Sequence, residues 1–157
     1  MKILIIGSKT KYSGSRLTHL EHFSYELEKF GIESKIVMDM DFLEKSVSLN
    51  LKKKITANKK LKNLLNTFEP NIVLLDNISR LAKTILDEKI PLFLLFRGNY
   101  WEQSEWAKKT IYKSPLKFFS VLKDQKLADR IFKESSMILP ISEYLKNEFQ
   151  MRYSKNK

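Results

Sequence analysis

Apolar residues follow two different spacings along this chain. Short, largely apolar runs, typical of buried strands, cover residues 2–6, 71–76, 91–96 and 136–140, and residues 33–38 are predicted to form a further strand. Helical spacing of three or four positions covers residues 16–30, 51–68, 79–88, 105–134 and 142–150. Apolar strands that alternate with helices indicate a parallel sheet buried on both faces. We therefore predict one Rossmann-like α/β domain over 1–157, with a doubly wound parallel sheet of about five or six strands.

Glycine, proline and serine mark the predicted helix ends. Gly31 stands in the C′ position after the first helix, and Pro70 ends the second. Pro115 predicts a break inside 105–134, because an interior proline removes a backbone donor. Ser79 and Ser142 are predicted N-caps of the helices that follow them.

A doubly wound sheet binds ligands beyond the carboxyl ends of its strands, where the strand order reverses. We expect the order 3-2-1-4-5, with this point between the first and the fourth strand. Two loops then border the site, 7–15 (GSKTKYSGS) and 97–101 (RGNYW). The first leads into a helix whose free amides can hold an anion. The alternative is that Gly7 and Gly14 only allow turns.

Positive charge is concentrated in two acid-free segments. The net charge is +11, yet residues 45–68 hold seven lysines and 106–123 hold five more, so the remaining residues are nearly neutral. Such local positive fields attract phosphates, whether of nucleic acid, anionic lipid or a sugar nucleotide.

Several chemistries are excluded by what the sequence lacks. With no cysteine, the chain has no disulfide, thiol nucleophile or cysteine metal site, which fits a reducing compartment. The loop GSKTKYSG matches neither the P-loop nor the dinucleotide fingerprint. His19 and His22 have no third ligand in register, so we expect two polar helix-face histidines and no metal. No run reaches the roughly 20 apolar residues of a membrane span.

Short motifs spread over nearly all of the chain resemble those of one family. The first set is Gly14, Ser15, His19, Phe23, Leu27 and Gly31. It is similar to the opening of the N-terminal domain of GT-B glycosyltransferases of the "glycosyl transferases group 1" (GT4-like) type. Residues 70–73 (PNIV) resemble the family's PDVV strand. Further similarities lie at 90–92, 97–98, 128–130 and 142–145.

The resemblance implies the acceptor-binding half of a retaining glycosyltransferase. Such an enzyme moves a sugar from a nucleotide-sugar donor to a lipid-linked or glycan hydroxyl, and the family needs no metal or other cofactor. The donor-binding C-terminal domain would be a partner, in cis or in trans, so residues 1–157 are not expected to be active by themselves. The implied substrate-binding residues are Gly7, Ser13, Gly14, Ser15, His19, Asn77, Arg97, Gly98 and Ser142.

The chain departs from the family pattern at three places. Ser15 replaces the second glycine of the usual pair, and residues 74–77 (LLDN) replace paired histidines. Arg97 replaces the histidine of a His-Gly pair, so no catalytic residue is assigned. An arginine at this position suits a phosphate ligand, because the planar guanidinium group can bind a phosphate through two hydrogen bonds. The alternative is that Arg97 pairs with Asp76 or Glu102 and only ties strand ends together.

Aromatic residues and lysines interleave between Tyr100 and Lys123. This composition suits the interface of an anionic membrane, where rings are buried and ammonium groups stay at the headgroups. The expected surface residues are Trp101, Trp106, Lys108, Lys109, Lys113 and Phe118. The alternative is an ordinary helix with aromatic residues in the core and solvated lysines. The first interpretation places the protein in the cytoplasm, peripheral at the inner face of the membrane.

A second function of a different class remains open. It is a non-catalytic basic Rossmann-like module that binds nucleic acid or an anionic membrane. Five arginines against 24 lysines argue against base-specific recognition, because bidentate guanine contacts favour arginine. Nucleic acid is therefore the less expected partner.

Overall fold

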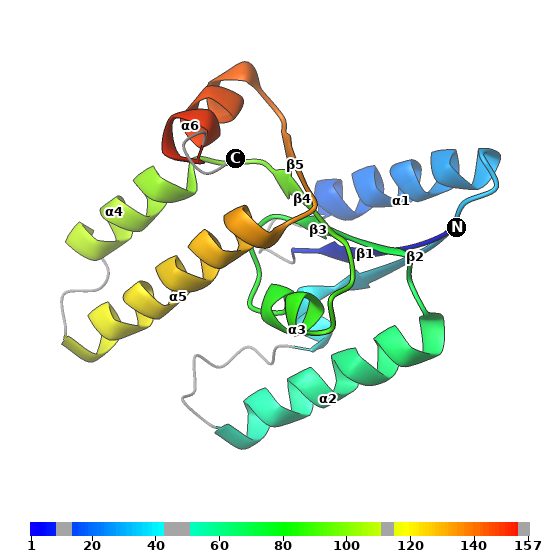
Figure 1. Cartoon of the computed structure of the whole chain (residues 1–157), viewed down its shortest axis with the longest axis horizontal. Helices are drawn as coiled ribbons and strands as arrows, with labels where there is room; N and C mark the ends of the chain where they lie inside the picture. Colours follow the sequence, from blue (N-terminus) through cyan, green and yellow to red (C-terminus); the bar gives the residue numbers. More distant parts are fainter. Residues whose placement is uncertain (9–13, 43–50, 111–114, 154–157) are drawn as a thin grey trace.

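The computed structural model describes residues 1–8, 14–42, 51–110 and 115–153, and it consists of a parallel five-stranded sheet flanked by helices (Figure 1). The strands are β1 (Lys2–Gly7), β2 (Glu33–Met38), β3 (Ile72–Asp76), β4 (Leu92–Phe96) and β5 (Met137–Pro140). The helices are α1 (Gly14–Lys29), α2 (Leu51–Phe68), α3 (Ala82–Asp87), α4 (Tyr100–Thr110), α5 (Pro115–Glu134) and α6 (Glu143–Tyr153), with a short 3-10 turn at Asp39–Asp41. The predicted Rossmann-like α/β fold with an all-parallel sheet is confirmed.

The order of the strands differs from the prediction. The sheet runs β2-β1-β3-β4-β5, so the expected order 3-2-1-4-5 is wrong. Glu33 and Lys35 make β2 partly polar and exposed, whereas β1 and β3 are almost wholly buried. Interior positions of a parallel sheet suit strands that are apolar on both faces, and polar strands suit an edge. The strand order therefore reverses between β1 and β3.

Each face of the sheet carries its own core cluster. On one face, helices α2, α3 and α5 pack against a large cluster that includes Leu4, Leu75 and Phe96. On the other face, called here the α1 face, Leu20 of α1 packs with Ile3, Ile5 and Leu74 in a smaller cluster. Side chains alternate along a strand, so the residues at the carboxyl ends are distributed between the same two faces.

Close packing of α1 on β1 depends on Gly7. A Cβ atom there would lie 2.7 Å from Leu20 Cδ1 and 2.8 Å from Met38 Sδ. Gly7 is therefore required by helix–strand packing, whereas a Cβ on Gly14 would meet no atom within 4 Å. At Gly31 the φ angle of 69° is the left-handed C′ conformation that the sequence predicted.

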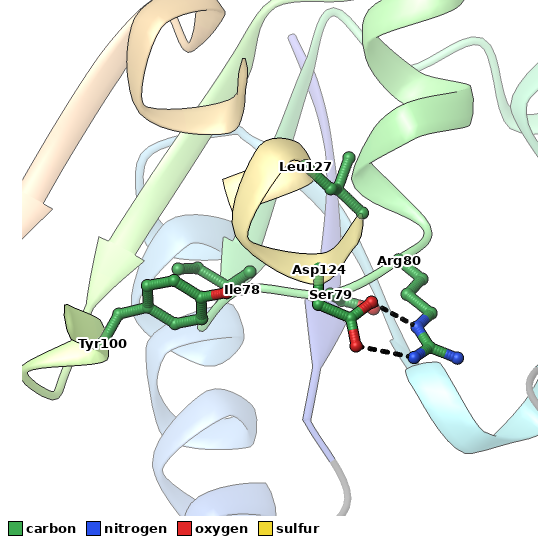
Figure 2. Close-up of a pocket in the computed structure, with 6 residues that line it drawn as sticks. All are labelled: Ile78, Ser79, Arg80, Tyr100, Asp124 and Leu127. Carbon is green, nitrogen blue, oxygen red and sulfur yellow. Dashed lines mark hydrogen bonds and ion pairs between the residues drawn. The ribbon is translucent and has the colours of Figure 1, made fainter. Parts of the chain in front are cut away.

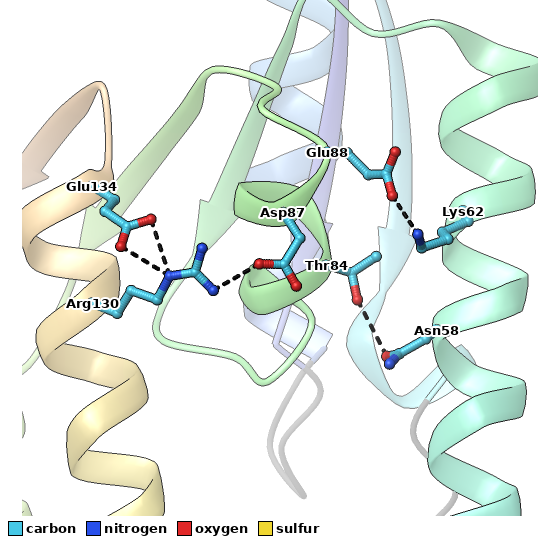
Figure 3. A network of polar contacts seen from close by, with 7 residues as sticks. All are labelled: Asn58, Lys62, Thr84, Asp87, Glu88, Arg130 and Glu134. Carbon is cyan, nitrogen blue, oxygen red and sulfur yellow. Dashed lines mark hydrogen bonds and ion pairs between the residues drawn. The ribbon is translucent and has the colours of Figure 1, made fainter.

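A polar network holds α3 between α2 and α5 (Figure 3). Arg130 of α5 donates to Asp87 at 2.8 Å and to Glu134 at 2.9 Å. On the other side, the Lys62 ammonium lies 2.5 Å from the Glu88 carboxylate, whose hydrogen bond and charge raise the pKa of Lys62. These ion pairs are exposed, so they fix the position of the helices more than they add free energy.

The predicted helix ends are partly confirmed. The Ser142 hydroxyl accepts a hydrogen bond from the Leu145 amide at 3.3 Å, so it is the N-cap of α6. Helix α5 begins at Pro115, which confirms the predicted break. Helix α3 begins at Ala82 rather than Ser79, because Ser79 accepts from the Leu81 amide in the turn before it. Within the described residues, no helix is long and apolar enough to cross a bilayer.

The Gly7 packing gives the first testable prediction. Gly7→Ala should lower the free energy of unfolding by about 1–3 kcal/mol, because its Cβ displaces Leu20 and Met38 from the core. Gly14→Ala is the matched control and should cost nothing measurable, since it meets open space. Urea unfolding followed by circular dichroism measures both. Equal stability of the two variants would contradict the packing role of Gly7.

Candidate functional site

A buried ion pair lies at the carboxyl edge of the sheet. Asp76 ends β3 and is 1% exposed, and Arg97 directly follows β4. The Arg97 Nε donates a hydrogen bond to Asp76 Oδ1, and the arginine side chain remains 27% exposed. Of the two interpretations of Arg97, its pairing with Asp76 is therefore present. A buried carboxylate is tolerated only when such a partner offsets its desolvation.

Asp76 is only half satisfied by this pair. Its second oxygen, Oδ2, is buried and has no hydrogen-bond partner among the described residues. Leaving a buried charged acceptor unpaired costs about 1–3 kcal/mol or more, so such atoms are rare in folded proteins. The described residues therefore supply no donor for this buried oxygen.

Arg16, which is positively charged, also has one buried polar atom without a partner among the described residues. It lies in the first turn of α1, and its buried Nη1 has no hydrogen-bond partner in the part of the chain that the structure describes. Within the described part of the chain, the other four arginines each bind a carboxylate. Arg16 Nη1 and Asp76 Oδ2 are the two buried side-chain atoms without a partner among the described residues.

Strand register and helix geometry bring Arg16 and Asp76 to one corner. Ile6 pairs with Leu75, so the next residues along these strands, Gly7 and Asp76, lie side by side. Leu20 packs on Gly7, and Arg16 precedes Leu20 by one helical turn on the same face of α1. The side chain of Asp76 has the same orientation as that of Leu74, which belongs to the α1 face.

Asn77 and Gly98 complete the backbone around the ion pair. Asn77 adopts a left-handed conformation with φ 82°, and its Oδ1 accepts from the Ile78 amide at 2.9 Å. Asparagine tolerates this conformation because its side chain can make such a local bond. Gly98 is half-buried, and a Cβ there would lie 2.9 Å from the flexible Gln103 side chain. Both residues shape the turns that follow β3 and β4.

A second polar cluster joins α4 to α6 at the ends of β4 and β5. Asn99 caps α4 by accepting from the Glu102 amide at 3.2 Å, and its Nδ2 donates to the Tyr144 hydroxyl at 2.7 Å. That hydroxyl in turn donates to the Glu102 carboxylate at 3.0 Å. The half-exposed Tyr144 and the exposed Glu102 thus present polar atoms next to the turn that carries Arg97.

A small pocket lies between the β3–α3 loop, α4 and α5 (Figure 2). Its volume is about 220 Å³, and it is lined by Ile78, Ser79, Arg80, Tyr100, Asp124 and Leu127. Arg80 donates to both carboxylate oxygens of Asp124, at 3.0 and 2.7 Å. Because these polar groups already bind one another, the pocket offers less unmet hydrogen bonding than the corner of Asp76 and Arg16.

Three other predicted substrate residues are at the surface. Gly14 and His19 are exposed on α1, and Ser142 is exposed at the start of α6. Ser13 lies outside the described residues, as does the side chain of Ser15. Their predicted contacts with a substrate stay predictions.

Arg16 and Tyr144 were not among the residues nominated from the sequence, and Asp76 was named only as a partner of Arg97. The sequence did contain a signal for Asp76. A charged residue at the carboxyl end of an apolar strand lies at the edge of the sheet where ligands bind. Arg16 carried none, since an arginine in a first helical turn is ordinarily solvated.

The predicted membrane residues divide into two groups. Trp101 is half-buried, stacks on Phe132 with ring centroids 5.0 Å apart, and lies beneath the Arg152 guanidinium. In contrast, Trp106 is 60% exposed and Lys109 is exposed. Trp101 thus takes part in the packing within the domain, whereas Trp106 is available at the surface.

Lys108 of α4 is the other predicted member whose side chain the structure describes. Lys108 binds Glu105 at 2.6 Å, and this hydrogen bond lowers the pKa of the Glu105 carboxyl. Phe119 of α5 is 61% exposed. Lys113 and the side chain of Phe118 lie outside the described residues.

Comparisons with known proteins add little. No family model matches the chain, and no curated protein matches it. A crystal structure of a conserved protein from Enterococcus faecalis V583 is similar at 14% identity and a TM-score of 0.39. The match covers 97% of this chain and 99% of that one, but a likeness this distant carries no argument about function. Among the described residues, no group of three or more metal-ligating side chains occurs.

The ionisation of Tyr100 tests whether its phenol is buried in the pocket. Burial, and next the Asp124 charge, raise the pKa of Tyr100 to about 12. The unfolded value is about 10, so stability from the neutral phenol is complete below pH ~10 and is lost as the pH rises through about 12. The ultraviolet absorbance of phenolate, compared between parent and Tyr100→Phe, should show one group that ionises near pH 12. Its appearance near pH 10 in the folded protein would mean that the phenol is solvated.

Proposed function

We propose that this chain is the acceptor-binding half of a glycosyltransferase of GT-B architecture, which works with a donor-binding domain in cis or in trans. The observation that carries the proposal is the unsatisfied Asp76 carboxylate at the point where the strand order reverses. The motif order described above supports the same assignment. Its site comprises Asp76, Arg97 and Arg16.

The chemistry of this corner suits a ligand rich in hydroxyl groups. A carboxylate oxygen without a partner accepts a hydrogen bond from a hydroxyl, and the nearby Tyr144 and Glu102 offer further donors and acceptors. In sugar transfer, the acceptor hydroxyl oxygen bonds to the anomeric carbon while the bond from that carbon to the donor phosphate breaks. The nucleoside diphosphate leaves with the electron pair, and the hydroxyl proton is released. Asp76 would orient the hydroxyl for this step.

The acceptor role is tested by titrating the ¹⁵N-labelled chain with neutral glycans and separately with UDP-glucose and GDP-mannose. Glycans should shift the amides around Asp76 and Arg97, whereas the nucleotide moiety should add little, because the donor site belongs to another domain. Sugar transfer by residues 1–157 by themselves should be undetectable, since donor and acceptor are not held together. Preferential binding of the nucleotide part at Asp76 would contradict the proposal.

Two aspartates provide a matched pair of variants for this titration. Asp76→Asn should weaken glycan binding about tenfold or more, because the amide replaces an acceptor oxygen by a donor. Asp124→Asn breaks the ion pair with Arg80 on the other side of the sheet and should leave glycan binding unchanged. Thermal unfolding shows whether each variant is folded at the titration temperature. Equal effects of the two substitutions would contradict a site at Asp76.

A specific observation also favours attachment to a membrane surface. Trp106 and Phe119 expose large aromatic rings on adjacent helices, together with Lys109. Aromatic burial and attraction to anionic headgroups would then act at the same surface, at roughly 1 kcal/mol for each lysine. We propose that this surface holds the domain reversibly at an anionic cytoplasmic leaflet, where a lipid-linked acceptor lies.

Sedimentation with phosphatidylserine vesicles measures this attachment. Trp106→Ala and the pair Lys108→Gln with Lys109→Gln should each reduce binding, the lysine pair by about 30-fold at two charges. Phe30→Ala, in the turn after α1, and the pair Lys59→Gln with Lys60→Gln on α2 are matched exposed controls and should bind like the parent. Equal losses in the controls, or tighter binding to oligonucleotides than to vesicles, would favour the non-catalytic basic module.

A further inference from the structure

The unpartnered atoms of Asp76 and Arg16 indicate which groups the ligand has besides hydroxyls. Arg16 and Asp76 have opposite charges, yet each keeps one buried polar atom without a partner among the residues that the structure describes. If the two side chains bound each other, neither atom would be unsatisfied. A ligand that satisfies both must therefore donate one hydrogen bond and accept another.

The charge of the corner is positive overall. Asp76 contributes one negative charge, while Arg97 and Arg16 contribute two positive charges. The first turn of α1, which holds Arg16, contains no acidic residue. The N-terminus of a helix also carries about half a positive charge. An anionic group on the ligand would therefore neutralise the positive charge of the site. The ligand would also carry the hydroxyl that donates a hydrogen bond to Asp76.

The donor groups at this corner suit a phosphate. Arg97 uses Nε for Asp76 and has further N–H groups on a side chain that is 27% exposed. Arg16 adds a buried N–H, and guanidinium groups bind phosphate oxygens in pairs. The buried Asp76 Oδ2, which has no partner among the described residues, is the second observation, besides the helix terminus, that points to a ligand.

We propose that Arg16, Asp76 and Arg97 bind a phosphorylated polyol, with the phosphate on the two arginines and a hydroxyl on Asp76. The inference rests on the proposed function, because the phosphorylated polyol is the sugar acceptor. The same chemistry occurs in a free sugar phosphate and in the headgroup of an inositol lipid. Both arginines recognise the anion, and Asp76 distinguishes a polyol from other phosphates.

The test compares five probes by calorimetry on the full chain. Glucose 6-phosphate should bind at least about tenfold more tightly than glucose or inorganic phosphate, because it alone places a phosphate on the two arginines and a separate hydroxyl on Asp76. Vesicles with phosphatidylinositol, compared with vesicles of phosphatidylserine at equal charge, distinguish a lipid headgroup from a free sugar phosphate. Tighter binding of either polyol phosphate than of its matched probe supports the proposal. Binding of neither overturns it.

Variants separate the two halves of the recognition. Arg16→Gln should weaken glucose 6-phosphate about tenfold and leave glucose unchanged. Asp76→Asn should remove the preference for glucose 6-phosphate over inorganic phosphate. Arg80→Gln is the matched control, because Arg80 lies on the other side of the sheet with Asp124. If folded Arg16→Gln keeps the parent's preference for glucose 6-phosphate over glucose, the proposal is overturned. This measurement tests the proposal even if Asp76→Asn does not fold.

Failure of this inference and failure of the proposed function give different results. If neutral glycans bind through Asp76 and a phosphate adds no affinity, the acceptor site stands and the phosphorylated ligand is wrong. If glucose 6-phosphate binds as expected but UDP-glucose competes for the same site through its nucleotide, the acceptor assignment is wrong. The phosphate-binding chemistry of Arg16 would then still hold.

Discussion

The parallel pairing of β1 with β3 is the constraint on which the rest of the structure depends. Both strands are apolar toward both faces of the sheet, so both need neighbours on each side and helices above and below. The partly polar β2 is thereby placed at an edge. The point where the strand order reverses follows directly, and with it the side-by-side ends of Gly7 and Asp76.

The same packing explains why a charged group could become buried at that point. Gly7 lets α1 approach β1 closely, and the strand alternation turns Asp76 toward this closed face. Arg97 then offsets part of the desolvation of the carboxylate, but it reaches only one oxygen. The unpartnered oxygen of Asp76 therefore results from the strand order and the packing of α1, and not from the conformation of one side chain.

Sequence patterns predicted the elements well because strand and helix periods are local. The order of the strands is not local, although Glu33 and Lys35 already indicated that their strand suits an edge. At the site, Arg97 was nominated because the end of an apolar strand is recognisable in sequence. Arg16 was not, because its meaning depends on Gly7, which brings its helix onto a strand whose neighbour ends in Asp76.

The central position of β1 also affects how the chain can fold during synthesis. Lys2 and Asn71, which meet where the β1–β3 pairing begins, lie 69 residues apart in the sequence. At roughly 5–20 residues per second, translation separates the two strands by about 3 to 14 s. During that interval the run KILIIG has α1 and the edge strand β2 as its neighbours, and one of its sides is unpaired. The nascent chain therefore exposes this largely apolar strand to chaperones until β3 emerges from the ribosome.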